Sequence, residues 1–203
     1  MKGQHIGKAP IIIAGLYIYL EFFTIVLPFA ASRLGGWLPD NVSEWLDSNY
    51  LIMGICILII PTILFLVMGI AYAVYGIKKS GEISDDEGVS LIRTQMIMRI
   101  VQIPCYVAVF VVAVICILTI FTFGFTLLLG VVDCISIVIT GMVSIPVYAI
   151  LKQSGRISYR RMVIYSVLSF VFCADLIVTA VCYNTVVKGN KISKESYDMD
   201  RIS

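Results

Sequence analysis

The amino-acid sequence predicts an all-α integral membrane protein, a polytopic bundle of about five transmembrane helices. Hydrophobic residues make up 60% of the chain and charged residues 14%, whereas soluble domains are about half apolar and a quarter charged. The mean hydropathy is +0.97, and several apolar runs exceed the roughly 18 residues typical of a membrane-spanning helix. A chain of 203 residues is usually one domain, so we expect a single domain whose core is built in lipid.

The first predicted span begins after a short N-terminal segment that contains two lysines, Lys2 and Lys8. A secretory signal has an apolar region of roughly 7–15 residues, and this run is longer, so we expect a retained helix. The third and fourth spans form one apolar block, which is too long for a single crossing and is predicted to fold back at Gly124. The five spans cover residues 11–31, 51–77, 100–121, 125–151 and 162–187.

The distribution of Lys and Arg predicts the orientation of these spans. With the N-terminus inside, the inner segments hold ten of the 15 basic residues and the outer segments hold five. Basic residues favour the cytoplasmic side, so we expect a plasma-membrane protein with a cytoplasmic N-terminus and an external C-terminus. The connections are then an outer loop at 32–50, inner loops at 78–99 and 152–161, and an outer tail at 188–203.

The first inner loop contains a predicted amphipathic helix over residues 84–99, which we expect to lie along the inner leaflet. Ser84 and Glu87 have capping-box spacing, and apolar residues follow at helical intervals. A short repeat also starts here, because residues 77–84 read IKKSGEIS and residues 151–158 read LKQSGRIS. The repeat indicates either a duplicated two-helix unit, as in transporters, or turn chemistry with Gly after one helix and Ser before the next; the second interpretation is favoured.

Glu21 is the first of three carboxylates within the predicted spans. An ionisable group at the bilayer centre costs upwards of ~2.5 kcal/mol, and such groups usually face the bundle interior and are often functional. Glu21 lies near the middle of the first span, with Tyr17 and Thr24 about one helical turn on either side. We expect both hydroxyls to be able to hydrogen-bond the carboxyl group.

Asp175 and Asp133 are the other two carboxylates within the spans. Asp175 lies near the middle of the fifth span with Thr179 on its face, and Asp133 lies in the outer third of the fourth span. No Lys or Arg is expected deep enough in a span to pair with any of the three. We predict that Glu21 and Asp175 face one shared interior region, whereas Asp133 is predicted to hold helices together.

Enzyme signatures are mostly absent, and we predict neither a cofactor nor a metal site. The only histidine, His5, lies in the N-terminal segment, which excludes an HExxH zinc site. A net charge of +2 does not indicate a nucleic-acid partner. We therefore expect a non-enzymatic protein of the bilayer, first a small transporter or permease-like component for an ion or small solute. The alternative is an accessory protein that contacts another membrane protein, such as an immunity factor, assembly partner or sensor subunit.

Overall fold

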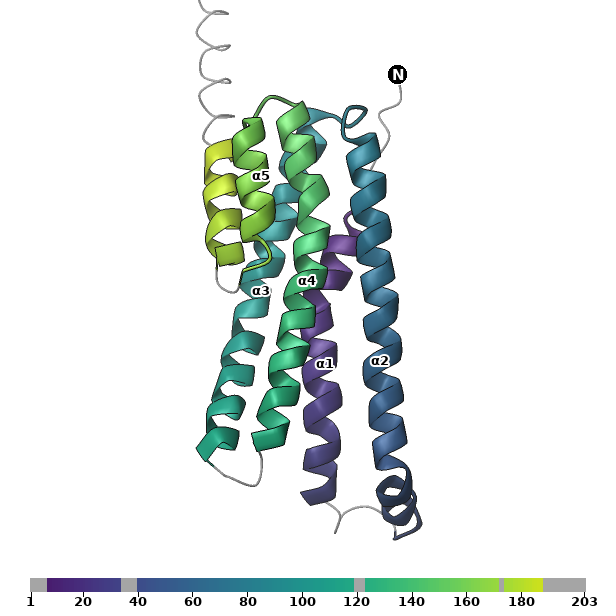
Figure 1. The fold of residues 1–203 in the computed structure, drawn as a ribbon. Helices are drawn as coiled ribbons and strands as arrows, with labels where there is room; N and C mark the ends of the chain where they lie inside the picture. The colour runs from purple at the N-terminus through teal and green to yellow at the C-terminus, as the bar shows by residue number, and fades with distance from the viewer. Residues whose placement is uncertain (1–6, 34–39, 119–122, 172–173, 188–203) are drawn as a thin grey trace, which may run out of the picture.

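The computed structural model describes residues 7–33, 40–118, 123–171 and 174–187. It describes the backbone only for residues 25–33 and 40–58 and for a few residues at the end of α3 and in the first half of α4. The described chain is helical, and its long helices form an up-and-down bundle (Figure 1). The elements are α1 (Ala9–Arg33), α2 (Asp40–Lys79), α3 (Asp85–Leu118), α4 (Phe123–Gln153), α5 (Tyr159–Leu168) and a C-terminal helix (Ala174–Val187).

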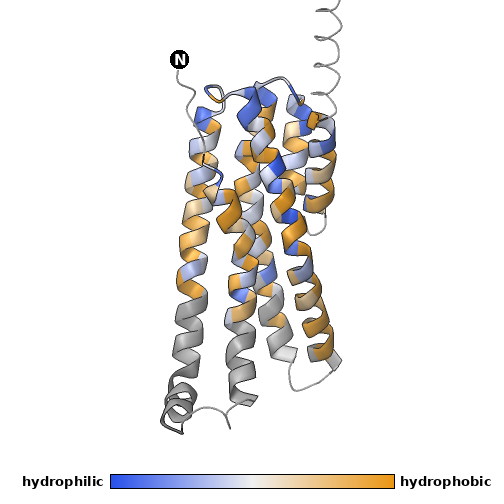
Figure 2. Ribbon diagram, turned by 180° about the vertical axis from the view of Figure 1, so that it is seen from behind, coloured by the Kyte–Doolittle hydropathy of each residue, from blue (hydrophilic) through white to orange (hydrophobic). Residues whose placement is uncertain are grey.

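The bundle is apolar along its length, as the sequence predicts for a membrane protein. Three helices of the described chain contain segments long and apolar enough to cross a membrane, namely Ile59–Lys79, Asp85–Ile115 and Asp133–Gln153. Large apolar side chains are exposed on their outer surfaces, and Figure 2 shows polar residues gathered at the end where α2 turns into α3. In water such a surface would be unfavourable, so these side chains face lipid.

The predicted inner loop at 78–99 is not a loop with a separate surface helix. α3 begins at Asp85 and continues without interruption to Leu118, and the backbone amide of Glu87 is 3.4 Å from the Ser84 hydroxyl that caps it. Leu91 and Ile92 are fully buried in the bundle. The prediction of an amphipathic helix lying on the membrane was therefore wrong, because the apolar positions of this segment face other helices rather than lipid headgroups.

The prediction of one continuous helix over residues 162–187 was also wrong. α5 ends at Leu168, where the amide of the C-cap residue Ser169 reaches back to the carbonyls of Tyr165 and Val167. The C-terminal helix then runs back alongside α5 (Figure 1), and the Arg156 guanidinium lies 3.4 Å from the carbonyl oxygen of Val186. The two short helices form a hairpin, which we call the half-hairpin, and the chain returns to the end of the bundle where α4 ended.

The backbone break in the half-hairpin packs tightly against α4. A Cβ atom on Gly141 would lie 2.9 Å from the Phe170 ring and 3.0 Å from the carbonyl oxygen of Ser169, so only glycine permits this approach. Non-helical backbone at membrane depth is tolerated only where protein covers it or where it lines a cavity. The contact at Gly141 provides part of that cover.

Both copies of the sequence repeat form turns at the same end of the bundle (Figure 1). In each copy a serine caps the following helix, with Ser84 bound by the amide of Glu87 and Ser158 by the amide of Arg161. Gly155 has a φ of 72°, which glycine adopts without strain. The repeat therefore has the turn chemistry that its sequence favoured.

A cluster of fully buried apolar residues lies between these turns and the middle of the bundle. Its members come from α3, α4 and the turn after α4, and we call them the apolar plug: Leu91, Ile92, Ile150, Leu151 and Ile157. Beyond the plug, buried polar side chains lie among the apolar ones in the interior of the bundle.

Candidate functional site

Arg99 is the centre of a buried polar group at the tip of the half-hairpin. It lies four turns into α3, is 6% exposed, and its Nη2 atom is 2.7 Å from Oδ2 of Asp175. The same nitrogen is 3.2 Å from the carbonyl oxygen of Thr140 and 3.1 Å from the Ser144 hydroxyl. The prediction that no basic residue lies deep enough to pair with a carboxylate was therefore wrong.

Asp175 occupies the first turn of the C-terminal helix. A carboxylate is favourable at a helix N-terminus, where the free backbone N–H groups leave partial positive charge. The break in the chain thus gives Asp175 two stabilising partners, the helix end and Arg99. A continuous helix over the same residues would have offered only the second.

A polar tract continues from Arg99 toward the apolar plug. The amide of Gln95, one turn away on α3, donates to the Ser144 hydroxyl at 2.6 Å. The same amide group is 3.4 Å from the hydroxyl of Tyr148 and 3.5 Å from that of Thr179. These side chains are nearly inaccessible to solvent, so the tract is an internal hydrogen-bond network that joins α3, α4 and the half-hairpin.

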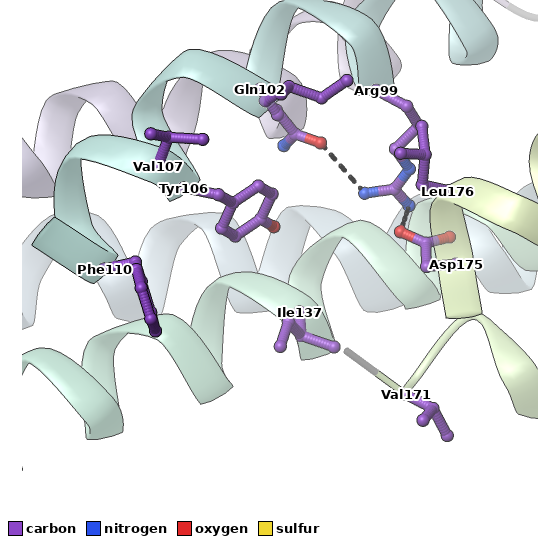
Figure 3. Close-up of a pocket in the computed structure, with 10 residues that line it drawn as sticks. Arg99, Gln102, Tyr106, Val107, Phe110, Ile137, Val171, Asp175 and Leu176 are labelled. Atoms are coloured by element: carbon purple, nitrogen blue, oxygen red, sulfur yellow. Dashed lines mark hydrogen bonds and ion pairs between the residues drawn. The ribbon is translucent and has the colours of Figure 1, made fainter. Parts of the chain in front are cut away.

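A cavity of about 300 Å³ lies against Arg99 and Asp175, on the side away from the apolar plug. We call it the tip pocket, and Figure 3 shows the Arg99–Asp175 pair at its polar end and Phe110 toward the other. The half-hairpin extends only part of the way along α3 (Figure 1), which leaves this space uncovered. Its lining residues are Arg99, Gln102, Ile103, Tyr106, Val107, Phe110, Ile137, Val171, Asp175 and Leu176.

Three buried polar atoms of the side chains that line the tip pocket have no hydrogen-bond partner within the described part of the chain. They are Nε of Arg99, Nε2 of Gln102 and Oδ1 of Asp175. The hydroxyl of Ser169 lies near Asp175, but it donates to the carbonyl oxygen of Tyr165 at 2.8 Å. Because an unpaired buried polar group costs about 1–3 kcal/mol, these atoms indicate a site for a further polar group.

The turn end of the bundle is held by a second charged pair, which we call the clamp. Nε of Arg156 donates to Oδ1 of Asp85 at 2.8 Å, Nη2 binds the other carboxylate oxygen, and Nη1 lies 3.4 Å from the Val186 carbonyl oxygen. The clamp therefore joins the start of α3, the turn after α4 and the end of the C-terminal helix. We refer to this end of the bundle as the clamp end.

The clamp is expected to weaken in acid. The hydrogen bonds from Arg156 hold the pKa of Asp85, which lies outside the apolar part of α3, below its usual value. A lowered folded-state pKa contributes stability that is present above the unfolded value of about 4 and is lost as the pH falls through the folded value. At pH 7 we expect the free energy of unfolding of the wild type to exceed that of Asp85→Asn by about 0.5–1 kcal/mol, a value typical of partly exposed ion pairs.

Thermal unfolding of both proteins between pH 7 and pH 3 measures this difference. It should shrink only below about pH 4, and a difference that is unchanged at pH 3 would contradict the assignment of the clamp to an ionised Asp85. Ser84→Ala is a useful comparison, because it removes a neighbouring helix cap without altering a titrating group.

Glu21 belongs to a separate group between α1 and α2. The Tyr17 hydroxyl donates to Oε1 of Glu21, and the Thr62 hydroxyl of α2 is 3.3 Å from the same oxygen. The Thr24 hydroxyl instead donates to the carbonyl of Leu20 at 2.7 Å, so the expectation that Thr24 could bind Glu21 was wrong.

A substitution pair tests the part that Glu21 plays. Glu21→Gln keeps an acceptor oxygen for Tyr17 and Thr62 and should lower the free energy of unfolding by less than about 1 kcal/mol. Glu21→Leu leaves both hydroxyls without their buried acceptor and should lower it by about 1–3 kcal/mol. Chemical unfolding in detergent measures both values, and equal losses for the two variants would show that these hydrogen bonds do not stabilise the bundle.

The structure divides the predicted site residues into two groups. Glu21 and Tyr17 bind Thr62, whereas Asp175 binds Arg99 and Thr179 contacts Gln95 and Tyr148. The predicted shared region for Glu21 and Asp175 is therefore not observed among the described contacts. Sequence reasoning missed Arg99, Gln95 and Gln102, although their spacing on one helical face was a usable signal.

Comparison of the chain with known proteins finds no matching family model, no similar curated protein and no similar solved structure. The function must therefore be argued from the tip pocket and its surroundings alone.

Proposed function

We propose that this chain is a small, non-enzymatic membrane transporter or permease-like component whose solute binds in the tip pocket. The observation that carries the proposal is the half-hairpin, whose tip meets a buried Arg99–Asp175 pair and a cavity of about 300 Å³. In membrane transporters, substrate sites lie near the bilayer midplane beside broken helices, where unpaired backbone and side-chain groups face a cavity. The tip pocket shares the break between two helices and the unpaired side-chain atoms beside a cavity.

The arrangement around the tip pocket favours access from one side at a time. Toward the clamp end, the polar tract is covered by the apolar plug, whose members are at most 4% exposed, and then by the clamp. In the other direction the described chain shows no such cover beside α3 and α4, because the half-hairpin ends while the four long helices continue (Figure 1). A solute released toward the clamp end would require the plug and the clamp to separate.

The basic residues support a cytoplasmic clamp end in the plasma membrane. Of the Lys and Arg residues near the helix ends of the described chain, only Arg33 lies at the opposite end. Basic residues favour the cytoplasmic side of a membrane. The clamp-end residues are Lys78, Lys79, Lys152, Arg156, Arg160 and Arg161.

The rival function is an accessory protein that contacts another membrane protein, and water in the tip pocket distinguishes it. A transporter needs the Arg99–Asp175 pair to be reachable by an aqueous solute, whereas an accessory protein needs it only as a dry link between helices. Glu21 does not contribute to the tip pocket, because it is not among the lining residues and its described partners Tyr17 and Thr62 lie between α1 and α2. Of the two carboxylates that were expected to form a solute site, Glu21 and Asp175, only Asp175 is part of the proposed site.

Thiol labelling tests the proposal. In a background without the native cysteines, Val107→Cys places a thiol on the open wall of the pocket, and Val111→Cys places one on α3 outside the pocket. The two valines are similarly exposed, at 56% and 48%, so they differ in whether they line the pocket. A membrane-impermeant thiol reagent should modify the first and not the second, because thiols react as thiolates in water and not in lipid. Failure to modify Val107→Cys from either side of the membrane would overturn the transport proposal in favour of the accessory protein.

A further inference from the structure

We infer that the tip pocket binds a zwitterionic amphiphile, a molecule with one ammonium group and one carboxylate or phosphate group on a compact apolar body. This inference rests on the proposed function and names its substrate class. It starts from three unpartnered atoms that lie just behind the pocket surface, on side chains that line it, because these atoms are of two kinds. Arg99 and Gln102 each have an unused N–H donor, and Asp175 has an unused acceptor oxygen.

The two kinds of unused atom call for a ligand that both accepts and donates. A carboxylate or phosphate oxygen accepts from guanidinium and amide N–H groups, and guanidinium is the side-chain group best matched to such oxygens. An ammonium group donates to a carboxylate oxygen. A carboxylate or phosphate oriented toward Arg99 and Gln102, with an ammonium toward Asp175, would use the three atoms together.

The charge balance of the site favours a ligand without net charge. Arg99 and Asp175 form a neutral pair at 2.7 Å, and their side chains are 5% and 12% exposed. A ligand with a single charge would leave an uncompensated charge in a low-dielectric interior, which is costly. A zwitterion adds one positive and one negative charge, each of which lies beside an opposite charge of the protein.

The walls of the pocket set the size and character of the rest of the ligand. Apart from the polar end, the lining is aliphatic or aromatic, with Val107 and Phe110 on α3 and Ile137 on α4 (Figure 3). At roughly 30 Å³ for a water-sized group, a cavity of about 300 Å³ holds on the order of ten non-hydrogen atoms. That size fits an amino acid with a branched aliphatic side chain, or the head and first carbons of a zwitterionic lipid.

Equilibrium binding of radiolabelled probes to the purified full chain in nanodiscs tests the inference and separates the two sources. The soluble arm compares leucine with 3-methylbutylamine, which lacks the carboxylate, and 4-methylpentanoate, which lacks the ammonium. The lipid arm compares dodecylphosphoethanolamine with dodecylphosphocholine, whose quaternary ammonium has no N–H to donate. Gln102→Leu and Val107→Trp are tested alongside, with Val111→Trp as the control outside the pocket.

We expect the zwitterion with N–H donors to bind about tenfold more tightly than its analogues in one arm, which identifies the source. Gln102→Leu should weaken that binding several-fold, Val107→Trp should abolish it, and Val111→Trp should leave it unchanged. An analogue with one charge that binds as tightly as the zwitterion would overturn the inference. The absence of binding in both arms would also overturn the inference. If Val107→Cys is nevertheless labelled in that case, the transport proposal stands and only this substrate class is excluded.

Discussion

Replacing Arg99 with Met is expected to destabilise the folded bundle by about 3–5 kcal/mol, the cost of leaving one member of a buried ion pair alone. The change removes the partner of Asp175 and also the hydrogen bonds to Ser144 and the Thr140 carbonyl. Asp175→Leu should cost a similar amount, because it leaves the guanidinium buried without a counter-charge. Chemical unfolding of the purified chain in detergent measures both losses.

The double variant Arg99→Met/Asp175→Leu is the informative control. Hydrophobic replacement of a whole buried pair is often neutral or stabilising, so the double variant should be more stable than either single variant, with a coupling energy of about 1–3 kcal/mol. Arg93→Met, a change at an exposed arginine of the same helix, should cost less than about 0.5 kcal/mol. Additive losses in the double variant would mean that the two charges do not stabilise each other.

A tag placed after Ser203 is expected on the same side of the membrane as residues 82 and 156. The half-hairpin brings Val186 back to Arg156, and the 16 residues that follow Val187 carry Lys188, Lys191 and Lys194. That segment is too short and too polar to cross the hydrocarbon core. Protease protection or an accessibility label at the three positions measures the outcome.

If residues 162–187 instead crossed the membrane once, the tag would lie on the opposite side of the membrane from residue 156. A tag on both the N-terminus and the C-terminus provides the matched comparison, because α1 begins, and the C-terminal helix ends, in the half of the bundle nearer the clamp (Figure 1). Opposite locations for the two tags would contradict the half-hairpin.

The helical membrane character of the protein could be predicted from the sequence because lipid imposes one simple requirement. Backbone polar groups must be satisfied within each segment, so a long apolar run becomes a helix. The caps at Ser84 and Ser158 were predictable for a similar reason, since their chemistry is local, and both serines cap the helices that follow them. The reversal predicted at Gly124 was misplaced by a few residues, because α4 already begins at Phe123 and the connection from Leu118 lies outside the described residues.

The site was less predictable because it depends on which residues meet between distant helices. In the sequence, Arg99 directly precedes the apolar run that predicts the third span. A span that began at residue 100 would place Arg99 at the membrane surface. α3 instead starts at Asp85, and that start puts Arg99 inside the bundle opposite Asp175. The pairing joins positions 76 residues apart in the sequence, which no local pattern specifies.

The break in the last apolar segment had two local signals that a hydropathy pattern does not contain. Ser169 is a polar residue that binds the preceding turn, and Asp175 is an acidic residue of the kind favoured at a helix start. Both lie within an apolar run of the length that a full crossing needs. Length therefore favoured one helix, whereas capping chemistry and the close approach at Gly141 favoured two.

The central claim is that the tip pocket communicates with the clamp end when the clamp opens, and thiol labelling from the clamp side tests it most directly. Val107→Cys is labelled in the wild-type clamp and in Arg156→Ala, with a reagent that cannot cross the membrane. The account predicts slow modification from the clamp side with the clamp intact and at least severalfold faster modification in Arg156→Ala, with Val111→Cys unreactive in both. An equal rate at Val107→Cys in the two backgrounds would contradict it.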